Sequence, residues 1–295
     1  MPALFVVTWD LILNVVIAGL LTGLVYGLMA LGLSVIFGVV RVVNFAHGEM
    51  MTIAMYAATV LFATFKLDPF LAVLPVSAAF FVFGYALQAK LINPFIARPE
   101  HSQFMLLVAV ALIMVNALLV IFGPGARNVQ TDYQLESWAL GPILFDKARV
   151  FAASAALAAA AALFAFFRFT LTGKAIRACA DNHLGARVVG LNVKHLYALT
   201  FGLGAACLAV AGCAMVLLVE VTPVLGPAYT LLAFVIVIVG GLGSMPGALL
   251  GGVLIGVSEA LAGLLIAPSA KSMFSFALLI LVLLFRPQGL LGRAR

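Results

Sequence analysis

The stretch RVVNFAHGEMM, residues 41–51, places polar side chains between two long apolar runs: Arg41, Asn44, His47 and Glu49. A histidine can exchange a proton near neutral pH, and a carboxylate inside a membrane can mark an ion or substrate pathway. An ionised group at the centre of a membrane helix costs roughly 2.5–3.5 kcal/mol on insertion scales. These side chains are therefore candidates for a pathway or gate, although nothing in the sequence requires proton coupling.

Motifs that carry enzymatic chemistry are missing from the sequence. It contains no H-E-x-x-H, no G-x-S-x-G and no P-loop, and the glycine-rich GLGSMPG lacks the G-K-[ST] ending. Its three cysteines, Cys179, Cys207 and Cys213, show no C-x-x-C spacing, so neither a disulfide framework nor a metal site is predicted. We expect a protein that is not an enzyme and binds no cofactor itself; if ATP drives it, another subunit binds the nucleotide.

The composition predicts the surroundings of these residues. Hydrophobic residues make up 65% of the 295 residues and charged residues 9%, whereas soluble domains carry about 25% charged residues. The apolar runs are continuous, as in membrane helices, and do not alternate as in barrel strands. We predict an all-α integral membrane protein, one domain over residues 1–295, with eight to ten spans. The apolar blocks run over about 11–38, 50–65, 70–92, 103–122, 150–168, 196–219, 229–241, 247–267 and 272–285.

Loop charges predict the orientation. Residues 168–194 carry five basic side chains against Asp181 alone, and the tail carries Arg286, Arg293 and Arg295. Basic loops face the cytoplasm, which also explains the net charge of +6 without a nucleic-acid partner. The balanced loop 123–149, with Tyr133 and Trp138, is expected outside. If nine blocks each cross once, the N-terminus is outside; the 229–241 block and the Asn44 region are candidates for broken or re-entrant segments.

Glycines follow two patterns. Gly19, Gly23 and Gly27 repeat every fourth residue, which favours close helix packing within the chain over a dimer seam. GGLGSMPG contains Gly240, Gly241 and Gly243 before Pro246 and cannot continue an ordinary helix. It is either a broken segment near a pathway or an interfacial turn.

Other polar residues interrupt the apolar blocks. Glu220 and Glu259 are expected near span ends, either solvated there or lining a pathway. Asn116 is expected to make a helix–helix hydrogen bond.

The segment 170–195 predicts two short helices outside the membrane. The second should run over about 182–189, with Asp181 or Asn182 as N-cap and Gly190 at its end. It is either a basic loop that only sets topology or a knob that docks on a soluble partner through small and basic residues: Gly185, Ala186 and Arg187.

Three stretches carry a resemblance to a known family. GLVYGLMALGLSVIFGVVRVVNFAHGEMM, VIVGGLGSMPGALLGGVLIG and LLFRPQGLLG resemble permease subunits, of the H type, of branched-chain amino-acid ABC importers, and the likeness covers nearly the whole chain. ADNHLGARVVGLNV resembles the degenerate coupling motif of importer permeases. The resemblance implies a type II importer fold and a helix that contacts the ATPase through Asp181, Asn182, Gly185, Ala186, Arg187, Gly190 and Leu191.

The resemblance also implies a complex in the bacterial inner membrane. Its members would be a second homologous permease, two cytoplasmic ATPases that bind ATP and Mg²⁺, and a periplasmic binding protein that delivers branched-chain amino acids. Asn44, His47 and Glu49 would lie where the first helix breaks, capping the backbone or, alternatively, lining the pathway together with the late glycines. Urea, short amides and aromatic acids remain alternative substrates, and a stand-alone secondary transporter coupled through Glu220 or Glu259, or a channel, remains an alternative mechanism.

Overall fold

The computed structural model describes residues 8–141 and 143–292. Two strands in these ranges, β1 (Ser137–Leu140) and β2 (Ile143–Asp146), pair antiparallel. Short π- or 3-10-helical turns lie at Leu87–Ile92, Asn93–Phe95, Pro223–Leu225 and Pro268–Ala270. The α-helices are α1 (Trp9–Val40), α2 (His47–Phe65), α3 (Pro69–Ala86), α4 (Glu100–Phe122), α5 (Lys147–Phe169), α6 (Leu171–Asp181), α7 (His183–Val188), α8 (Val193–Met215), α9 (Gly226–Gly240), α10 (Met245–Leu265) and α11 (Lys271–Phe285).

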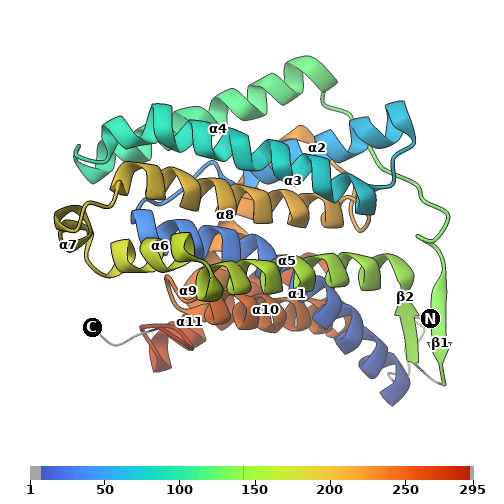
Figure 1. Ribbon diagram of the computed structural model, residues 1–295. Helices are drawn as coiled ribbons and strands as arrows, with labels where there is room; N and C mark the ends of the chain where they lie inside the picture. The colour runs from blue at the N-terminus through green and yellow to red at the C-terminus, as the bar shows by residue number, and fades with distance from the viewer. Residues whose placement is uncertain (1–7, 142, 293–295) are drawn as a thin grey trace.

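Nine helical stretches in the described part of the chain are long and apolar enough to cross a bilayer, within the expected eight to ten. They run side by side in one bundle, which we call the layer, with α7 at one end and the β1–β2 hairpin at the other (Figure 1). These are called the α7 end and the hairpin end below. Because a helix satisfies its own backbone groups, such a layer is stable in hydrocarbon.

Polar caps determine where several of these helices begin. Asp68 precedes Pro69 and accepts a hydrogen bond from the Phe70 N–H at 2.8 Å, which starts α3. Thr8 caps α1 in the same way, and its hydroxyl oxygen lies 3.4 Å from the Leu11 nitrogen. Caps of this kind satisfy N–H groups that have no partner within the helix.

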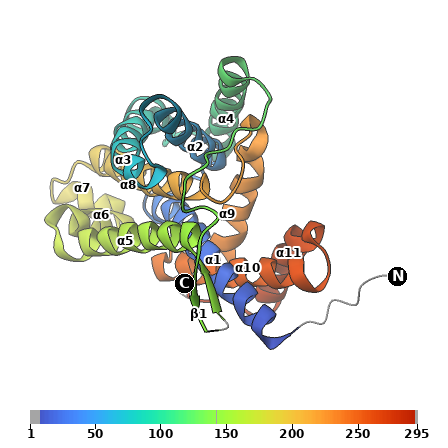
Figure 2. The same ribbon diagram turned by 90° about the vertical axis from the view of Figure 1, so that its right-hand side faces the viewer.

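The central helices pack closely because small residues face each other. α8 packs against α1, α2 and α3, and most of its residues are buried. Along α1, a Cβ atom added at Gly23 would lie 2.8 Å from the Gly252 carbonyl oxygen of α10, and one at Gly19 would lie 2.8 Å from that of Gly256. The glycine repeat therefore serves packing within the chain, as the sequence favours. Figure 2 shows α1 crossing beside α10.

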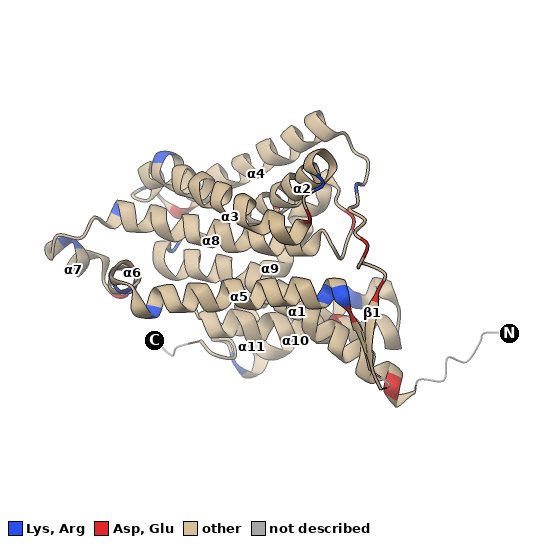
Figure 3. Ribbon diagram, turned by 45° about the vertical axis from the view of Figure 1, so that its right-hand side comes forward, with Lys and Arg blue, Asp and Glu red and all other residues tan. Residues whose placement is uncertain are grey.

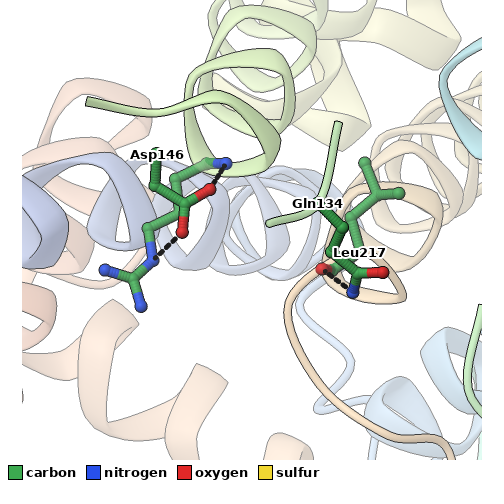
Figure 4. Close-up of polar contacts among 4 residues, drawn as sticks. Gln134, Asp146 and Leu217 are labelled. Carbon is green, nitrogen blue, oxygen red and sulfur yellow. Dashed lines mark hydrogen bonds and ion pairs between the residues drawn. The ribbon is translucent and has the colours of Figure 1, made fainter. Parts of the chain in front are cut away.

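The loop before α5 is more ordered than the sequence indicates, because it forms the β1–β2 hairpin. The Gln134 side chain donates to the Leu217 carbonyl oxygen at 2.8 Å, which ties the loop to the chain after α8 (Figure 4). Asp146 accepts from the Arg149 backbone N–H at 3.2 Å and so caps α5. The Leu144 N–H donates to Asn14 Oδ1 of α1 at 2.7 Å, which anchors the hairpin on the helical layer.

Charged residues gather at the two ends of the layer (Figure 3). The α7 end carries Arg168 in the last turn of α5 and the basic residues of α6 and α7, whereas acids and bases mix around the hairpin. Arg293 and Arg295, used above to orient the tail, lie outside the described residues.

The structure confirms some of the predictions for polar residues within the apolar blocks and contradicts others. The expectation for Asn116 is wrong, because its amide donates to the Leu112 carbonyl oxygen of its own helix at 2.7 Å. An asparagine satisfied within one turn needs no second helix. Glu220 is exposed just after α8, as expected. Glu259 lies six residues before the end of α10, where the Ser275 hydroxyl of α11 donates to its Oε1 at 2.6 Å.

Candidate functional site

The first site feature is a helix that begins inside the layer. The α1–α2 link, residues 41–46, leaves the end of α1 at Arg41, whose φ of 58° turns the chain back. His47, at the start of α2, places Nε2 3.0 Å from the Met29 carbonyl oxygen. Met29 precedes the end of α1 by about three turns, or roughly 16 Å. α2 therefore begins within the layer and not at its surface.

α9 begins at the same depth and meets α2 there. The Gly48 N–H donates to Thr230 Oγ1 at 2.8 Å, and the Thr230 hydroxyl donates to Glu49 Oε2 at 3.0 Å. A Cβ atom added at Gly48 would lie only 1.9 Å from the Gly226 carbonyl oxygen. We call this contact, formed by Gly48, Glu49, Gly226 and Thr230, the junction. The two broken segments expected near Asn44 and in the 229–241 block thus meet each other.

Electrostatics explains why a carboxylate lies there. Glu49 is only 4% exposed. It stands in the first turn of α2 and against Gly226, the first residue of α9. Helix N-termini carry a partial positive charge, and a carboxylate beside two of them offsets both.

The neighbouring polar residues are also buried. Asn44 Oδ1 accepts from the Ala46 N–H at 3.1 Å, so this side chain satisfies the backbone of the link. The Met29 carbonyl can only accept, so His47 Nε2 carries the proton and Nδ1 is an acceptor. Nδ1 has no hydrogen-bond partner among the described residues. Asn44 and His47 therefore support the broken segment.

The late glycines form a turn at the α7 end. Gly240 and Gly241 pack against Gly247 and the segment after α11, and the Leu291 N–H donates to the Gly240 carbonyl oxygen at 3.0 Å. Gly241 and Gly243 have φ values of 106° and 78°, which favour glycine. GGLGSMPG is thus the turn between α9 and α10. Of its three candidate glycines, Gly243 lines the cavity described next, whereas Gly240 and Gly241 do not.

A cavity of about 2130 Å³ opens at the α7 end; we call it the vestibule. Its walls come from the end of α1, the link, the start of α4, the end of α5, α6 and the turn between α9 and α10. Charged residues on its lining are Arg41, Arg168, Lys174, Arg177, Glu100 and Asp181. Aromatic residues on its lining are Phe37, Phe45, Phe104, Phe164, Phe167 and Phe169.

α7 projects beyond the layer (Figure 1), and it follows α6, which lines the vestibule. Asn182 is the N-cap of α7, where its Oδ1 accepts from the Gly185 N–H at 2.9 Å. The helix ends with Gly190 at φ 85°, and the Leu191 N–H donates to the Ala186 carbonyl oxygen at 3.0 Å. The predicted short helix is confirmed within one residue at each end.

The surface of this projection is apolar at its tip. Leu184, Val188 and Val189 are exposed, and Val188 is 87% exposed. Asp181 is exposed and lines the vestibule, Gly185 is half-buried, Ala186 is buried, and Arg187 and Gly190 are exposed. We call α7 with Val189 and Gly190 the knob. Burial raises the pKa of the Cys179 thiol in α6, beneath the knob.

Several site residues were not predicted from the sequence, among them Thr230, Phe45 and Phe104. Thr230 stands alone in an apolar block, and Phe45 and Phe104 look like ordinary membrane residues. The signal that does exist is Gly48, since a glycine beside buried polar residues indicates a close backbone approach. It does not say which segment approaches.

Membrane-length helices, two of which begin inside the layer, together with a vestibule at one end, define a polytopic membrane transport protein. The family model for the permease component of branched-chain amino acid transport systems matches residues 15–283. The chain belongs to this family of ABC importer permeases and is a transport subunit, not an enzyme.

Curated relatives agree over most of the chain. It is 32% identical to the high-affinity branched-chain amino acid transport system permease protein LivH of Salmonella typhimurium and to that of Escherichia coli K12, over 93% of this chain and 94% of each relative. It is 30% identical to BraD of Pseudomonas aeruginosa, over 95% and 96% respectively. No solved structure matched the chain.

Proposed function

We propose that the chain is one of two permease subunits of an importer for branched-chain or related hydrophobic amino acids. Two cytoplasmic ATPases would supply the energy by binding ATP with Mg²⁺, and a periplasmic binding protein would deliver the substrate. The relatives' names support the substrate, since each is a permease of branched-chain amino acid transport. The vestibule supports it too, because phenylalanine walls suit apolar side chains better than urea or short amides.

The charge distribution supports an orientation with the α7 end in the cytoplasm. Basic residues cluster on α6, α7 and the neighbouring helix ends (Figure 3), and such clusters face the cytoplasm. The hairpin end would then meet the binding protein outside, and the C-terminus would lie inside.

The knob is the proposed coupling element. Its apolar tip, Leu184 and Val188, suits a groove on a soluble subunit, as an amphipathic helix does. The residues around the tip would either contact the ATPase directly or cap the two ends of α7. They are Asp181, Asn182, Gly185, Ala186, Arg187, Gly190 and Leu191. Movement of the ATPases would shift α6 and α7, and with them one wall of the vestibule.

The pathway is proposed to pass the vestibule and the junction. Asn44, His47 and Glu49 would act by fixing the positions of the link and of the two broken helices. Gly243 would act as a residue without a side chain on the vestibule lining. Gly240 and Gly241 would act only indirectly, through the turn that carries Gly243. The single observation that carries the transport proposal is an open vestibule lined by α6, with an exposed, capped knob directly after that helix.

The test is uptake of radiolabelled leucine into proteoliposomes that hold the chain with the partner permease, ATPases and binding protein. We expect uptake that requires ATP, supplied on the side of the proteoliposome membrane on which the ATPases lie. Uptake should be lost when the ATPases are omitted. Gradient-driven uptake by the chain alone would instead support a secondary transporter, and passive flux would support a channel. Competition with isoleucine, phenylalanine and urea ranks the substrate classes.

A further inference from the structure

Three aromatic rings from distant segments meet at the inner end of the vestibule. Phe45 of the link packs edge-on against Phe104 of α4, with ring centroids 4.6 Å apart. On its other side Phe45 packs against Phe234 of α9, with centroids 5.2 Å apart. The sequence separates these residues by 59 and 189 positions, so only the fold brings them together.

The rings stand between the open vestibule and the close-packed polar contact of the junction. Phe45 and Phe104 both line the vestibule. Behind them, the Phe45 carbonyl oxygen lies 3.5 Å from the Thr230 hydroxyl of the junction, and Thr230 is buried. Phe45 therefore separates the buried polar groups of the junction from the vestibule.

The segment that carries the central ring is weakly tied. Among the hydrogen bonds of the described residues, the backbone N–H groups of the link contribute two, from Arg41 to the Phe37 carbonyl oxygen and from Ala46 to Asn44 Oδ1. Arg41 also holds a φ of 58°, which is unfavourable for a residue other than glycine. Because the link lies outside both helices, it can change conformation without unfolding either of them.

We infer that Phe45, Phe104 and Phe234 form a hydrophobic gate that separates the junction from the vestibule, with the α1–α2 link as its moving part. This inference rests on the proposed transport function. Closely packed apolar rings exclude water and polar solutes, and the contacts between rings are weak enough to be broken and remade during transport. Phe45 contacts both of the other rings and is the central element.

The gate can be tested by cysteine accessibility in membrane vesicles that hold the chain with its partner subunits. The native cysteines Cys179, Cys207 and Cys213 are first replaced by alanine. Thr230→Cys then places a thiol behind the gate, and Ala165→Cys places one on the exposed wall of the vestibule. A membrane-impermeant maleimide is added to inside-out and to right-side-out vesicles, so that the side of the vestibule is established in the same experiment.

We expect rapid labelling of Cys at 165 and slow labelling of Cys at 230. Phe45→Ala should raise the labelling rate at 230 by roughly tenfold or more, since an apolar constriction is removed, and Phe104→Ala should raise it less. Phe169→Ala is the matched control, because it removes a ring that lines the same vestibule but does not join the cluster. Unchanged labelling at 165 in each variant shows that the fold is retained.

Two results would overturn the gate: rapid labelling at 230 with all three rings present, or equally slow labelling at 230 in Phe45→Ala and Phe104→Ala with normal labelling at 165. Neither depends on transport. If the labelling follows the expectation but the complex with all rings present takes up no amino acid, the proposed function fails and the barrier stands.

Discussion

The Thr230 hydroxyl donates a hydrogen bond to Glu49 Oε2 at 3.0 Å, which joins the first turn of α9 to the first turn of α2. The Thr230 hydroxyl oxygen also accepts a hydrogen bond from the Gly48 N–H. One side chain thus satisfies both a backbone donor and a carboxylate, and both side chains are buried. The two interrupted helices depend on this contact for their relative position.

Thr230→Val tests that dependence. Valine has nearly the same shape but leaves the Gly48 N–H without a partner and removes the Thr230 donor from Glu49 Oε2, and each buried group left unpaired costs about 1–3 kcal/mol. We expect a lower midpoint of thermal unfolding for the purified protein. Thr59→Val is the control, since the Thr59 hydroxyl only bonds the Met55 carbonyl oxygen of its own helix. Equal midpoints for the two variants would contradict the role of Thr230.

Gly23→Ala tests the contact between α1 and α10. The added methyl would lie 2.8 Å from the Gly252 carbonyl oxygen, so the helices must separate, and overpacking of this kind costs roughly 1–3 kcal/mol. We expect a reduced yield of monodisperse protein and a lower unfolding midpoint. At Gly125, a Cβ atom would meet nothing within 4 Å, and Gly125→Ala should behave as the parent does. A tolerated Gly23→Ala would mean that this seam is looser than described.

Asn182→Ala tests the cap that holds the knob. Loss of the hydrogen bond to the Gly185 N–H should destabilise α7 by about 0.5–2 kcal/mol. Uptake should fall while assembly of the complex persists, because the helix frays but the membrane helices are untouched. Asn182→Asp keeps an oxygen acceptor and should restore uptake. If alanine and aspartate transport alike, the cap does not matter for coupling.

The reactivity of Cys179 should report on burial beneath the knob. Because burial raises the pKa of this thiol, it is protonated at neutral pH, and the thiolate that reacts with maleimide forms only as pH rises. In a protein without Cys207 and Cys213, labelling should be slow at about pH 7 and increase up to about pH 9 and beyond. Val188→Cys, placed at an exposed position on a Cys179→Ala background, should label faster at each pH. Equal rates for the two thiols would show that Cys179 is not shielded.

Local sequence signals predicted much of the architecture. Apolar block length predicted the nine membrane-length helices found among the described residues, and Asn182 with Gly190 predicted the bounds of α7, because caps act within a few residues of their own position. The spacing of Gly19, Gly23 and Gly27 indicated packing, and the structure supplies the partner on α10.

The site itself depends on contacts that no local pattern contains. Glu49 and Thr230 are 181 residues apart, and threonine in an apolar block gives no sign of a carboxylate partner. The cluster of Phe45, Phe104 and Phe234 could not be predicted from the sequence either, since phenylalanine is common in membrane helices. The β1–β2 hairpin was missed for another reason: its strands are four residues each, and their order comes from bonds to α1 and to the chain after α8.

The most direct test of the coupling role is a photo-crosslink from the knob. A photoreactive amino acid at Val188, and for comparison one at the exposed Leu135 of the hairpin end, would be activated in the assembled complex. We predict that position 188 crosslinks to an ATPase subunit and position 135 does not. Crosslinking of the ATPase from position 135, or none from position 188 in a complex that still imports leucine, would contradict the assignment of the knob as the contact with the motor.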